Sequence, residues 1–132
     1  MIMNIALIAH DKKKELMGAF CIAYRDILSG HKLFATADTA SVLVEVSGLS
    51  VIKVSQGIIG GQQLSLRAAY NEVDLVIFFR DPDSHMNYEP DIGGILNLCD
   101  QNHIPFATNI ATAELLIKSL ARGELDWRNN VK

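Results

Sequence analysis

Short apolar runs alternate with longer mixed segments along the whole chain. Each apolar run is short enough for one buried β-strand. The runs that predict strands span residues 3–9, 32–35, 51–54, 74–79 and 105–107. After the first run, Leu16, Phe20, Ala23 and Ile27 recur at steps of three and four, the spacing of an amphipathic helix. The segments that predict helices span residues 11–28, 39–47, 62–71, 91–102 and 111–122.

These strand-then-helix units predict an α/β fold, in which a doubly wound, five-stranded parallel sheet carries helices on both faces. Residues 74–79 are apolar on both faces, which is typical of a central strand. The 132 residues contain no internal repeat, linker or low-complexity stretch, so we expect a single domain over residues 1–132. A tail that contains Trp127 follows the last predicted helix and could pack back on the domain.

Composition argues against several functional classes. The net charge of −3 comes from 12 basic and 15 acidic residues, so no basic excess is present to neutralise a nucleic-acid backbone. No apolar run approaches the ~20 residues that span a bilayer, and the N-terminus lacks the basic region of a signal peptide. Cys21 and Cys99 lack the CxxC spacing of a metal or redox site and are expected to be buried thiols. We therefore expect a cytoplasmic protein that binds neither nucleic acid nor membrane.

Polar side chains follow each predicted strand. The carboxyl ends of parallel strands meet at one edge of a sheet, where α/β proteins bind ligands. The segments at this edge span residues 10–14, 36–39, 55–63, 80–91 and 108–109. They supply hydroxyls, a histidine, a lysine and the N–H groups of helix N-termini, which are donors suited to an anion. We therefore expect a site for a phosphate or carboxylate ligand.

Simpler structural roles remain open for these segments. Residues 36–39 and Asp91 can cap helices, and Gly60–Gly61 can form a tight turn. The lysines at 12–14 can form an exposed helix face. Taken together at one edge, however, the segments favour a ligand site over separate structural roles.

Two ligand classes known from similar folds are disfavoured. No GxGxxG motif follows the first predicted strand, which argues against a dinucleotide. A phosphorylated receiver domain would need an aspartate where Ser55 stands and a lysine where Thr108 stands. The expected ligand is therefore a small anion.

Several segments along the chain match one known pattern: Ile8–Asp11 with Lys14, Phe34–Thr36, Ser55 with Gly60–Gln63, Phe78–Pro82, Glu89–Asp91 and Pro105–Ala113. Together these segments resemble the methylglyoxal synthase family over nearly the whole chain. The resemblance implies a methylglyoxal synthase-like domain in a cytoplasmic homohexamer, without metal or organic cofactor. It also implies a lyase that removes a carbon-bound proton from dihydroxyacetone phosphate, forms an enediolate and releases methylglyoxal and phosphate. Such chemistry needs a positioned base and donors aimed at the developing oxyanion.

The resemblance assigns roles residue by residue. His10 and Lys14 match substrate contacts, and His10 also matches a catalytic position. Asp81 and Asp91 match acidic residues of the catalytic pocket. Thr36, Thr39 and Ser55 match phosphate contacts. The full set at substrate-binding positions in these two loops is Thr36, Ala37, Asp38, Thr39, Ser55, Gln56 and Gly57.

Three positions depart from the family. The family's general base is an aspartate between a Gly-Gly pair and a Gln-Gln pair. In this chain either Gly61 occupies the position of that aspartate, or the aspartate is deleted and the loop carries an extra residue near Gln56. Asp38 replaces a hydroxyl of the phosphate loop, and two like unit charges ~4 Å apart repel by roughly 4 kcal/mol at an effective dielectric constant of about 20. Tyr88, at a substrate-binding position, replaces a histidine for which His85 could substitute.

The sequence therefore predicts a methylglyoxal synthase-type lyase whose activity is impaired because its base is missing. Asp91, Asp81 or Asp38 could take over as the base. Two alternatives stay open: a non-catalytic or regulatory homologue that binds a small anion, and a lyase or isomerase for another small hydroxycarbonyl compound. The expected partners are a small phosphorylated or other anionic metabolite and further copies of this chain.

Overall fold

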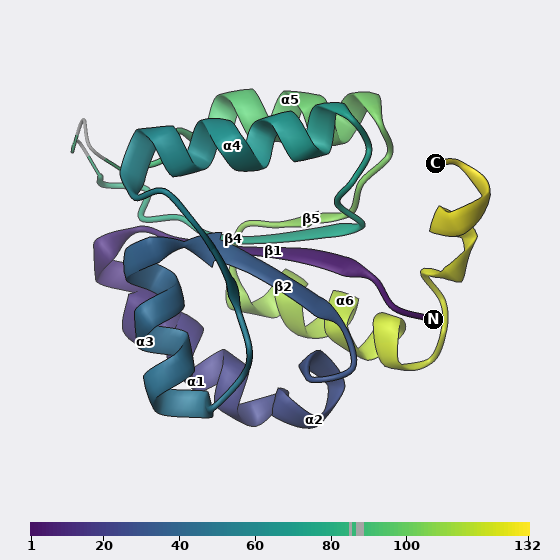
Figure 1. The fold of residues 1–132 in the computed structure, drawn as a ribbon, viewed down its shortest axis with the longest axis horizontal. Helices are drawn as coiled ribbons and strands as arrows, with labels where there is room; N and C mark the ends of the chain where they lie inside the picture. The colour runs from purple at the N-terminus through teal and green to yellow at the C-terminus, as the bar shows by residue number, and fades with distance from the viewer. Residues whose placement is uncertain (85, 87–88) are drawn as a thin grey trace.

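One five-stranded, fully parallel sheet forms the centre of the computed structural model, which describes residues 1–84, 86 and 89–132 (Figure 1). The strand order is β3-β2-β1-β4-β5, so the predicted parallel α/β sheet is confirmed. The predicted central position of β4 is also confirmed, since it lies between β1 and β5. The strands are β1 (Asn4–Ala9), β2 (Lys32–Thr36), β3 (Ile52–Val54), β4 (Leu75–Phe79) and β5 (Phe106–Ala107).

Helices cover both faces of the sheet, as predicted (Figure 1). Alternate residues of β1 point to opposite faces, because side chains in a strand have a period of two. Ile5 packs in one buried cluster with Met17, whereas Ile8 packs in another with Leu64. One face carries α1 (Lys14–Ala23), α2 (Arg25–Leu28), α3 (Ala37–Ser47) and α6 (Ile110–Ala121). The other face carries α4 (Gly57–Ala69) and α5 (Ile92–Gln101).

Two helices differ from the sequence prediction. The segment predicted as one helix over 11–28 is divided into η1 (Asp11–Lys13), α1 and α2, and the chain leaves helical geometry at Tyr24 (φ −111°, ψ 23°). Helix α4 begins at Gly57, five residues before the expected start. Gly60 and Gly61 are therefore helical and do not form the tight turn that the sequence allowed.

Gly60 is required by close packing of α4 against the end of β3. A β-carbon at this position would clash with the carbonyl oxygen of Ser55 and would lie 2.8 Å from Thr36 Cγ2. A side chain here would push the start of α4 away from the sheet edge that carries the candidate site. The glycine that suggested a turn thus marks a tertiary contact.

Both cysteines are buried free thiols, as the sequence predicts. Cys21 lies in the cluster beneath α1 and Cys99 in the cluster beneath α5. Burial raises the pKa of each thiol to about 12, so both stay protonated and unreactive near neutral pH. Across residues 1–84, 86 and 89–132, helices long and apolar enough to span a membrane are absent.

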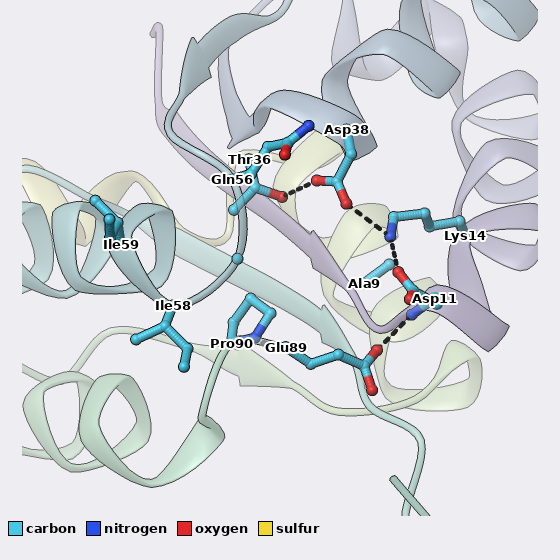
Figure 2. A pocket seen from close by; sticks show the side chains of 11 residues that line it. Ala9, Asp11, Lys14, Thr36, Asp38, Gln56, Ile58, Ile59, Glu89 and Pro90 are labelled. Carbon is cyan, nitrogen blue, oxygen red and sulfur yellow. Dashed lines mark hydrogen bonds and ion pairs between the residues drawn. The ribbon is translucent and has the colours of Figure 1, made fainter. Parts of the chain in front are cut away.

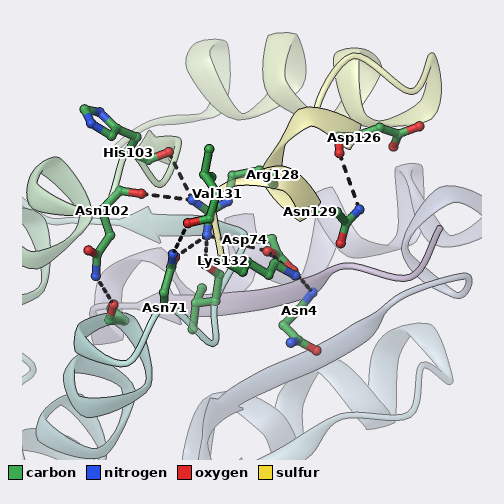
Figure 3. Close-up of polar contacts among 12 residues, drawn as sticks. Asn4, Asn71, Asp74, Asn102, His103, Asp126, Arg128, Asn129, Val131 and Lys132 are labelled. Carbon is green, nitrogen blue, oxygen red and sulfur yellow. Dashed lines mark hydrogen bonds and ion pairs between the residues drawn. The ribbon is translucent and has the colours of Figure 1, made fainter.

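The C-terminal segment packs back on the amino ends of the strands, as expected, and Arg128 anchors it (Figure 3). This residue belongs to η2 (Asp126–Asn130) and its side chain is fully buried. Its guanidinium donates to the carbonyl oxygen of Val73 at 2.9 Å and to Asn71 Oδ1 at 2.6 Å. Trp127, by contrast, is 43% exposed. This cluster lies at the opposite end of the strands from the candidate site.

Candidate active site

A cavity of about 330 Å³, here called the first cavity, opens at the carboxyl ends of β1 and β2 (Figure 2). Its walls come from the ends of these strands, the start of α1, the start of α4 and the segment before α5. The residues that line it are Ala9, Asp11, Lys14, Thr36, Asp38, Gln56, Gly57, Ile58, Ile59, Glu89 and Pro90.

A second cavity, of about 390 Å³, lies beside the first at the loop that follows β4. The two cavities share Ile58, Glu89 and Pro90, so these residues lie between them. The remaining residues that line the second cavity are His10, Arg80, Asp81, Pro82, Ser84, Met86, Asp91 and Ile92. The sheet edge identified from the sequence therefore carries two adjacent cavities.

His10 connects the end of β1 to the loops on either side of the second cavity. Its buried ring accepts a hydrogen bond at Nδ1 from the backbone N–H of Asp81, at 2.9 Å. Its Nε2 lies 3.0 Å from the carbonyl oxygen of Pro90. Because a backbone N–H can only donate, Nδ1 is the acceptor and Nε2 carries the proton. The neutral imidazole thereby fixes the spacing between Asp81 and Pro90.

Lys14 lies between two carboxylates in the first cavity (Figure 2). Its ammonium donates to Asp11 Oδ1 and pairs with Asp38 Oδ2 at 2.9 Å. Burial lowers the pKa of Lys14, but the hydrogen bonds and negative charges of Asp11 and Asp38 outweigh burial, and the pKa is raised overall. Lys14 is therefore a protonated cation at neutral pH.

Asp38 is held by three donors. Besides Lys14, the hydroxyl of Thr36 donates to Asp38 Oδ1 at 3.1 Å, and the backbone N–H of Thr39 donates to the same oxygen at 3.0 Å. Burial raises the pKa of Asp38, but the hydrogen bond and charge of Lys14, together with the other two donors, lower it overall. Asp38 is therefore an ionised carboxylate at neutral pH.

Glu89 is the acidic residue between the two cavities. It is buried, and Glu89 Oε2 accepts a hydrogen bond from the backbone N–H of Asp11 at 2.6 Å. Glu89 Oε1 accepts a hydrogen bond from the hydroxyl of Ser84. Both of these donors are neutral groups. Glu89 thus differs from Asp11 and Asp38, whose carboxylates pair with the ammonium of Lys14.

The structure distributes the candidate residues from the sequence among several places. The first cavity is lined by Lys14, Thr36, Asp38, Gln56 and Gly57. The second cavity is lined by His10, Asp81 and Asp91. The residues that line neither cavity are Ala37, Thr39, Ser55 and Gly61. Tyr88, and His85 as its possible substitute, lie outside the described residues.

Two of these residues have clear structural roles. Asp91 caps α5, because Asp91 Oδ1 accepts a hydrogen bond from the backbone N–H of Gly93 at 3.3 Å. The capping role that the sequence allowed is therefore confirmed. The backbone N–H of Ser55 donates to Gln63 Oε1 at 2.8 Å, which ties the end of β3 to α4. In the part of the chain that the structure describes, His, Cys, Asp and Glu residues form no cluster of three that could hold a metal ion.

Comparison with known proteins identifies the family. The MGS-like domain family matches residues 18–108. A protein named methylglyoxal synthase from Caldicellulosiruptor saccharolyticus is 57% identical over 130 residues, which cover 98% of this chain and 92% of that protein. The chain belongs to the methylglyoxal synthase family. A second relative with the same name, from Listeria welshimeri, is 51% identical over 128 residues, or 96% of each chain.

A solved structure agrees with this membership of the methylglyoxal synthase family. The crystal structure of methylglyoxal synthase from Elizabethkingia anophelis NUHP1 has a TM-score of 0.84 to this chain at 33% identity. The match covers 88% of this chain and 77% of that chain. The methylglyoxal synthase-like fold expected from the resemblance is therefore confirmed.

Gly61 and Asp38 are two of the positions at which the sequence departs from the methylglyoxal synthase pattern, and the structure shows what surrounds each of them. Gly61 lies in α4, and a β-carbon there would lie 3.1 Å from Pro90 Cβ, so a side chain at this position would face the residue between the cavities. Asp38 points into the first cavity, where Lys14 compensates its charge. The sequence led us to expect that Asp38 repels a bound phosphate. The structure adds an ion pair with Lys14, which the sequence did not reveal.

Among the residues that line the first cavity, Asp11, Ile58, Ile59 and Glu89 were not candidates from the sequence. Two of them carried a signal, since Asp11 follows His10 and Glu89 belongs to the Glu-Pro-Asp segment that matches the methylglyoxal synthase family. The two isoleucines carried none, because the start of α4 was expected five residues later.

Proposed function

We propose that the chain is a carbon–oxygen lyase of the methylglyoxal synthase type that converts dihydroxyacetone phosphate to methylglyoxal and phosphate in the first cavity. The observation that carries this proposal is the arrangement of an ammonium, a hydroxyl and a buried carboxylate around one cavity of about 330 Å³. These groups belong to Lys14, Thr36 and Glu89. The membership of the methylglyoxal synthase family gives independent support.

The reaction proceeds in two stages. A base removes a proton from the hydroxymethyl carbon of the substrate, and the electron pair of the C–H bond moves towards the carbonyl oxygen to form an enediolate. The bond between carbon and the phosphate oxygen then breaks and phosphate leaves with the electron pair, while the hydroxyl group on the deprotonated carbon loses its proton and becomes the aldehyde. The enolate that remains takes up a proton at its terminal carbon to become methylglyoxal. The ammonium of Lys14 supplies positive charge near the developing oxyanion and the leaving phosphate.

We assign the proton acceptor to Glu89. Asp11 and Asp38 both bind the Lys14 ammonium, and an ion-paired carboxylate is a weaker base. Glu89 is buried between the two cavities and accepts hydrogen bonds from neutral donors. The carboxylates nominated from the sequence, Asp81 and Asp91, lie on the second cavity, where they can orient substrate through His10 and α5.

A reduced rate is part of the proposal. The resemblance places the family's aspartate base either at Gly61 or at a deleted position, with an extra loop residue near Gln56, and neither alternative supplies a carboxylate. Each oxygen of Glu89 already accepts a hydrogen bond, so one of these bonds must be given up or shared before that oxygen can accept the substrate proton. We therefore expect turnover that is measurable but slower than that of relatives with the aspartate.

We also propose that the chain assembles with copies of itself, as a homohexamer, in the cytoplasm. Large apolar side chains are exposed on the outer helices, among them Leu66, Tyr70 and Leu115, and a second copy could cover them. The two free buried thiols are consistent with a reducing compartment. Sedimentation equilibrium of the purified protein tests the assembly: a hexamer mass supports it, and a monomer at micromolar concentration contradicts it.

The function is tested by incubating the purified protein with dihydroxyacetone phosphate while methylglyoxal and phosphate are measured together. We expect both products in equal amounts, above the spontaneous rate. Glu89→Gln should lower kcat by about a hundredfold, the lower range of general-base catalysis. The control is Glu45→Gln, which changes an exposed glutamate of α3 and should leave kcat unaltered. Absence of product formation overturns the proposed reaction, and full activity of Glu89→Gln overturns the assignment of the base.

A further inference from the structure

Asp38 is bound by the kinds of groups that bind phosphate in proteins. Its carboxylate contacts the ammonium of Lys14 at 2.9 Å, the hydroxyl of Thr36 at 3.1 Å and the backbone N–H of Thr39 at 3.0 Å. The last of these belongs to the first turn of α3, a helix of 11 residues whose N-terminus favours negative charge. Lysine, hydroxyl and helix N-terminus together form a donor set for a tetrahedral anion as much as for a carboxylate.

We propose that Asp38 is a built-in substitute for the substrate phosphate: its carboxylate occupies the subsite formed by Lys14, Thr36 and Thr39. This inference rests on the proposed function, because that function places the phosphate of the substrate in the first cavity. An incoming phosphate must displace Asp38 from these donors before it can bind. Asp38 is therefore a specificity-determining residue that weakens the binding of phosphorylated ligands.

The charge balance of the first cavity supports this inference. Among its described lining residues, one cation, Lys14, faces three carboxylates, those of Asp11, Asp38 and Glu89. A phosphate monoester adds up to about −2. Since Lys14 already contacts two of the carboxylates, the phosphate meets no uncompensated positive charge among these residues until Asp38 moves away. The cavity therefore accepts the uncharged hydroxycarbonyl part of a ligand more readily than its phosphate.

The position of Asp38 allows it to move. Its side chain is 41% exposed, and it lies in the first turn of α3 without contributing to either buried cluster. A change of its rotamer exposes the Thr39 N–H and the Lys14 ammonium without unfolding the helix. Binding of phosphate thus requires a local side-chain change, whose energetic cost appears as a weaker affinity.

Asp11 provides a matched control. It also contacts the Lys14 ammonium, but the Thr36 hydroxyl and the Thr39 N–H bind Asp38 instead. Asp11→Asn and Asp38→Thr therefore remove the same formal charge from the same cavity, and only Asp38→Thr vacates the donor set. If bulk charge alone opposed phosphate, the two variants would gain affinity equally.

The test is isothermal titration calorimetry of inorganic phosphate into the wild type, Asp38→Thr, Asp38→Asn and Asp11→Asn at neutral pH. We expect Asp38→Thr and Asp38→Asn to lower the Kd for phosphate by about tenfold or more, and Asp11→Asn by about threefold at most. Equal gains for Asp11→Asn and the Asp38 variants, or no gain for the Asp38 variants, overturn the proposal. Circular dichroism spectra of the four proteins confirm that each is folded.

The same variants separate this inference from the proposed function. Asp38→Thr should lower KM for dihydroxyacetone phosphate, with a smaller effect on kcat, because displacement of Asp38 precedes the chemical steps. If Asp38→Thr tightens phosphate binding and none of the proteins forms methylglyoxal, the inference about Asp38 is supported and the proposed reaction is overturned. If methylglyoxal is formed and phosphate affinity does not change, the reaction is supported and the role of Asp38 is overturned.

Discussion

Gly61 faces Pro90 across the boundary between the two cavities: a β-carbon at Gly61 would lie 3.1 Å from Pro90 Cβ. The carbonyl oxygen of Pro90 is in turn bound by the ring of His10, at 3.0 Å. Gly61 is therefore packed against the segment that contains Glu89 and Pro90. A side chain at Gly61 must move this segment by a few tenths of an ångström to fit.

The two neighbouring glycines of α4 should respond differently to alanine. Gly60→Ala should lower the free energy of unfolding by about 3 kcal/mol, since its β-carbon would clash with the Ser55 backbone. Gly61→Ala should change it by no more than about 1 kcal/mol, because the higher helix propensity of alanine offsets the contact with Pro90. Urea unfolding of both variants checks this difference. Equal destabilisation would contradict the packing of α4 described above.

Arg128 should be essential for stability although it lies far from the cavities. Its buried guanidinium lies 3.6 Å from Asp74, whose carboxylate is also buried. Arg128→Met should lower the free energy of unfolding by about 3 kcal/mol or more, because it leaves buried carbonyl groups and part of the Asp74 charge without a partner. Arg122→Met, which removes an exposed ion pair with Glu124, should cost about 0.5 kcal/mol or less. Similar costs for the two variants would contradict this account.

The ion pair of Lys14 and Asp38 should make stability depend on pH at the acidic end. The pKa of Asp38 is lowered from its ordinary value of 3.8, so its contribution is present above that pH and is lost as the pH falls through the lowered pKa. The pKa of Lys14 is raised above 10.5, so its contribution is present below that pH and is lost as the pH rises through the raised pKa.

Thermal unfolding of the wild type and Asp38→Asn measures this dependence. The difference in Tm between the two proteins should be constant from pH 5 to neutral pH. As the pH falls below 3.8, the Tm of the wild type should fall relative to that of Asp38→Asn. Asparagine has nearly the size of aspartate but does not ionise, so the pH dependence of the difference isolates the ionisation of Asp38. A difference that stays the same throughout the acidic range would show that Asp38 is not ion-paired.

The fold could be predicted from the sequence because the signals for strands are local. Residues 74–79 are apolar on both faces, and β4 lies inside the sheet as that pattern requires. The start of α4 could not be predicted in the same way. Gly60 is required because a β-carbon would meet Ser55 and also Thr36 at the end of β2, and a local pattern cannot distinguish this from a glycine in a turn.

The candidate site could be predicted only as far as one edge of the sheet. Parallel strands bring Lys14 and Asp38 to that edge, but their ion pair depends on the packing of α1 against α3, which the spacing of 24 residues does not reveal. The division into two cavities depends on Pro90, whose place is set by its hydrogen bond to His10. The burial of Glu89 follows from this same tertiary arrangement.

The most direct test of the central claim compares dihydroxyacetone phosphate turnover by the wild type, Gly61→Asp and Gly61→Asn, with methylglyoxal and phosphate measured together. Aspartate and asparagine make the same contact with Pro90, so only the carboxylate differs. We predict slow formation of both products by the wild type, a kcat about a hundredfold higher for Gly61→Asp, and no gain for Gly61→Asn. A wild type that forms neither product, or that is already as fast as Gly61→Asp, would contradict the account.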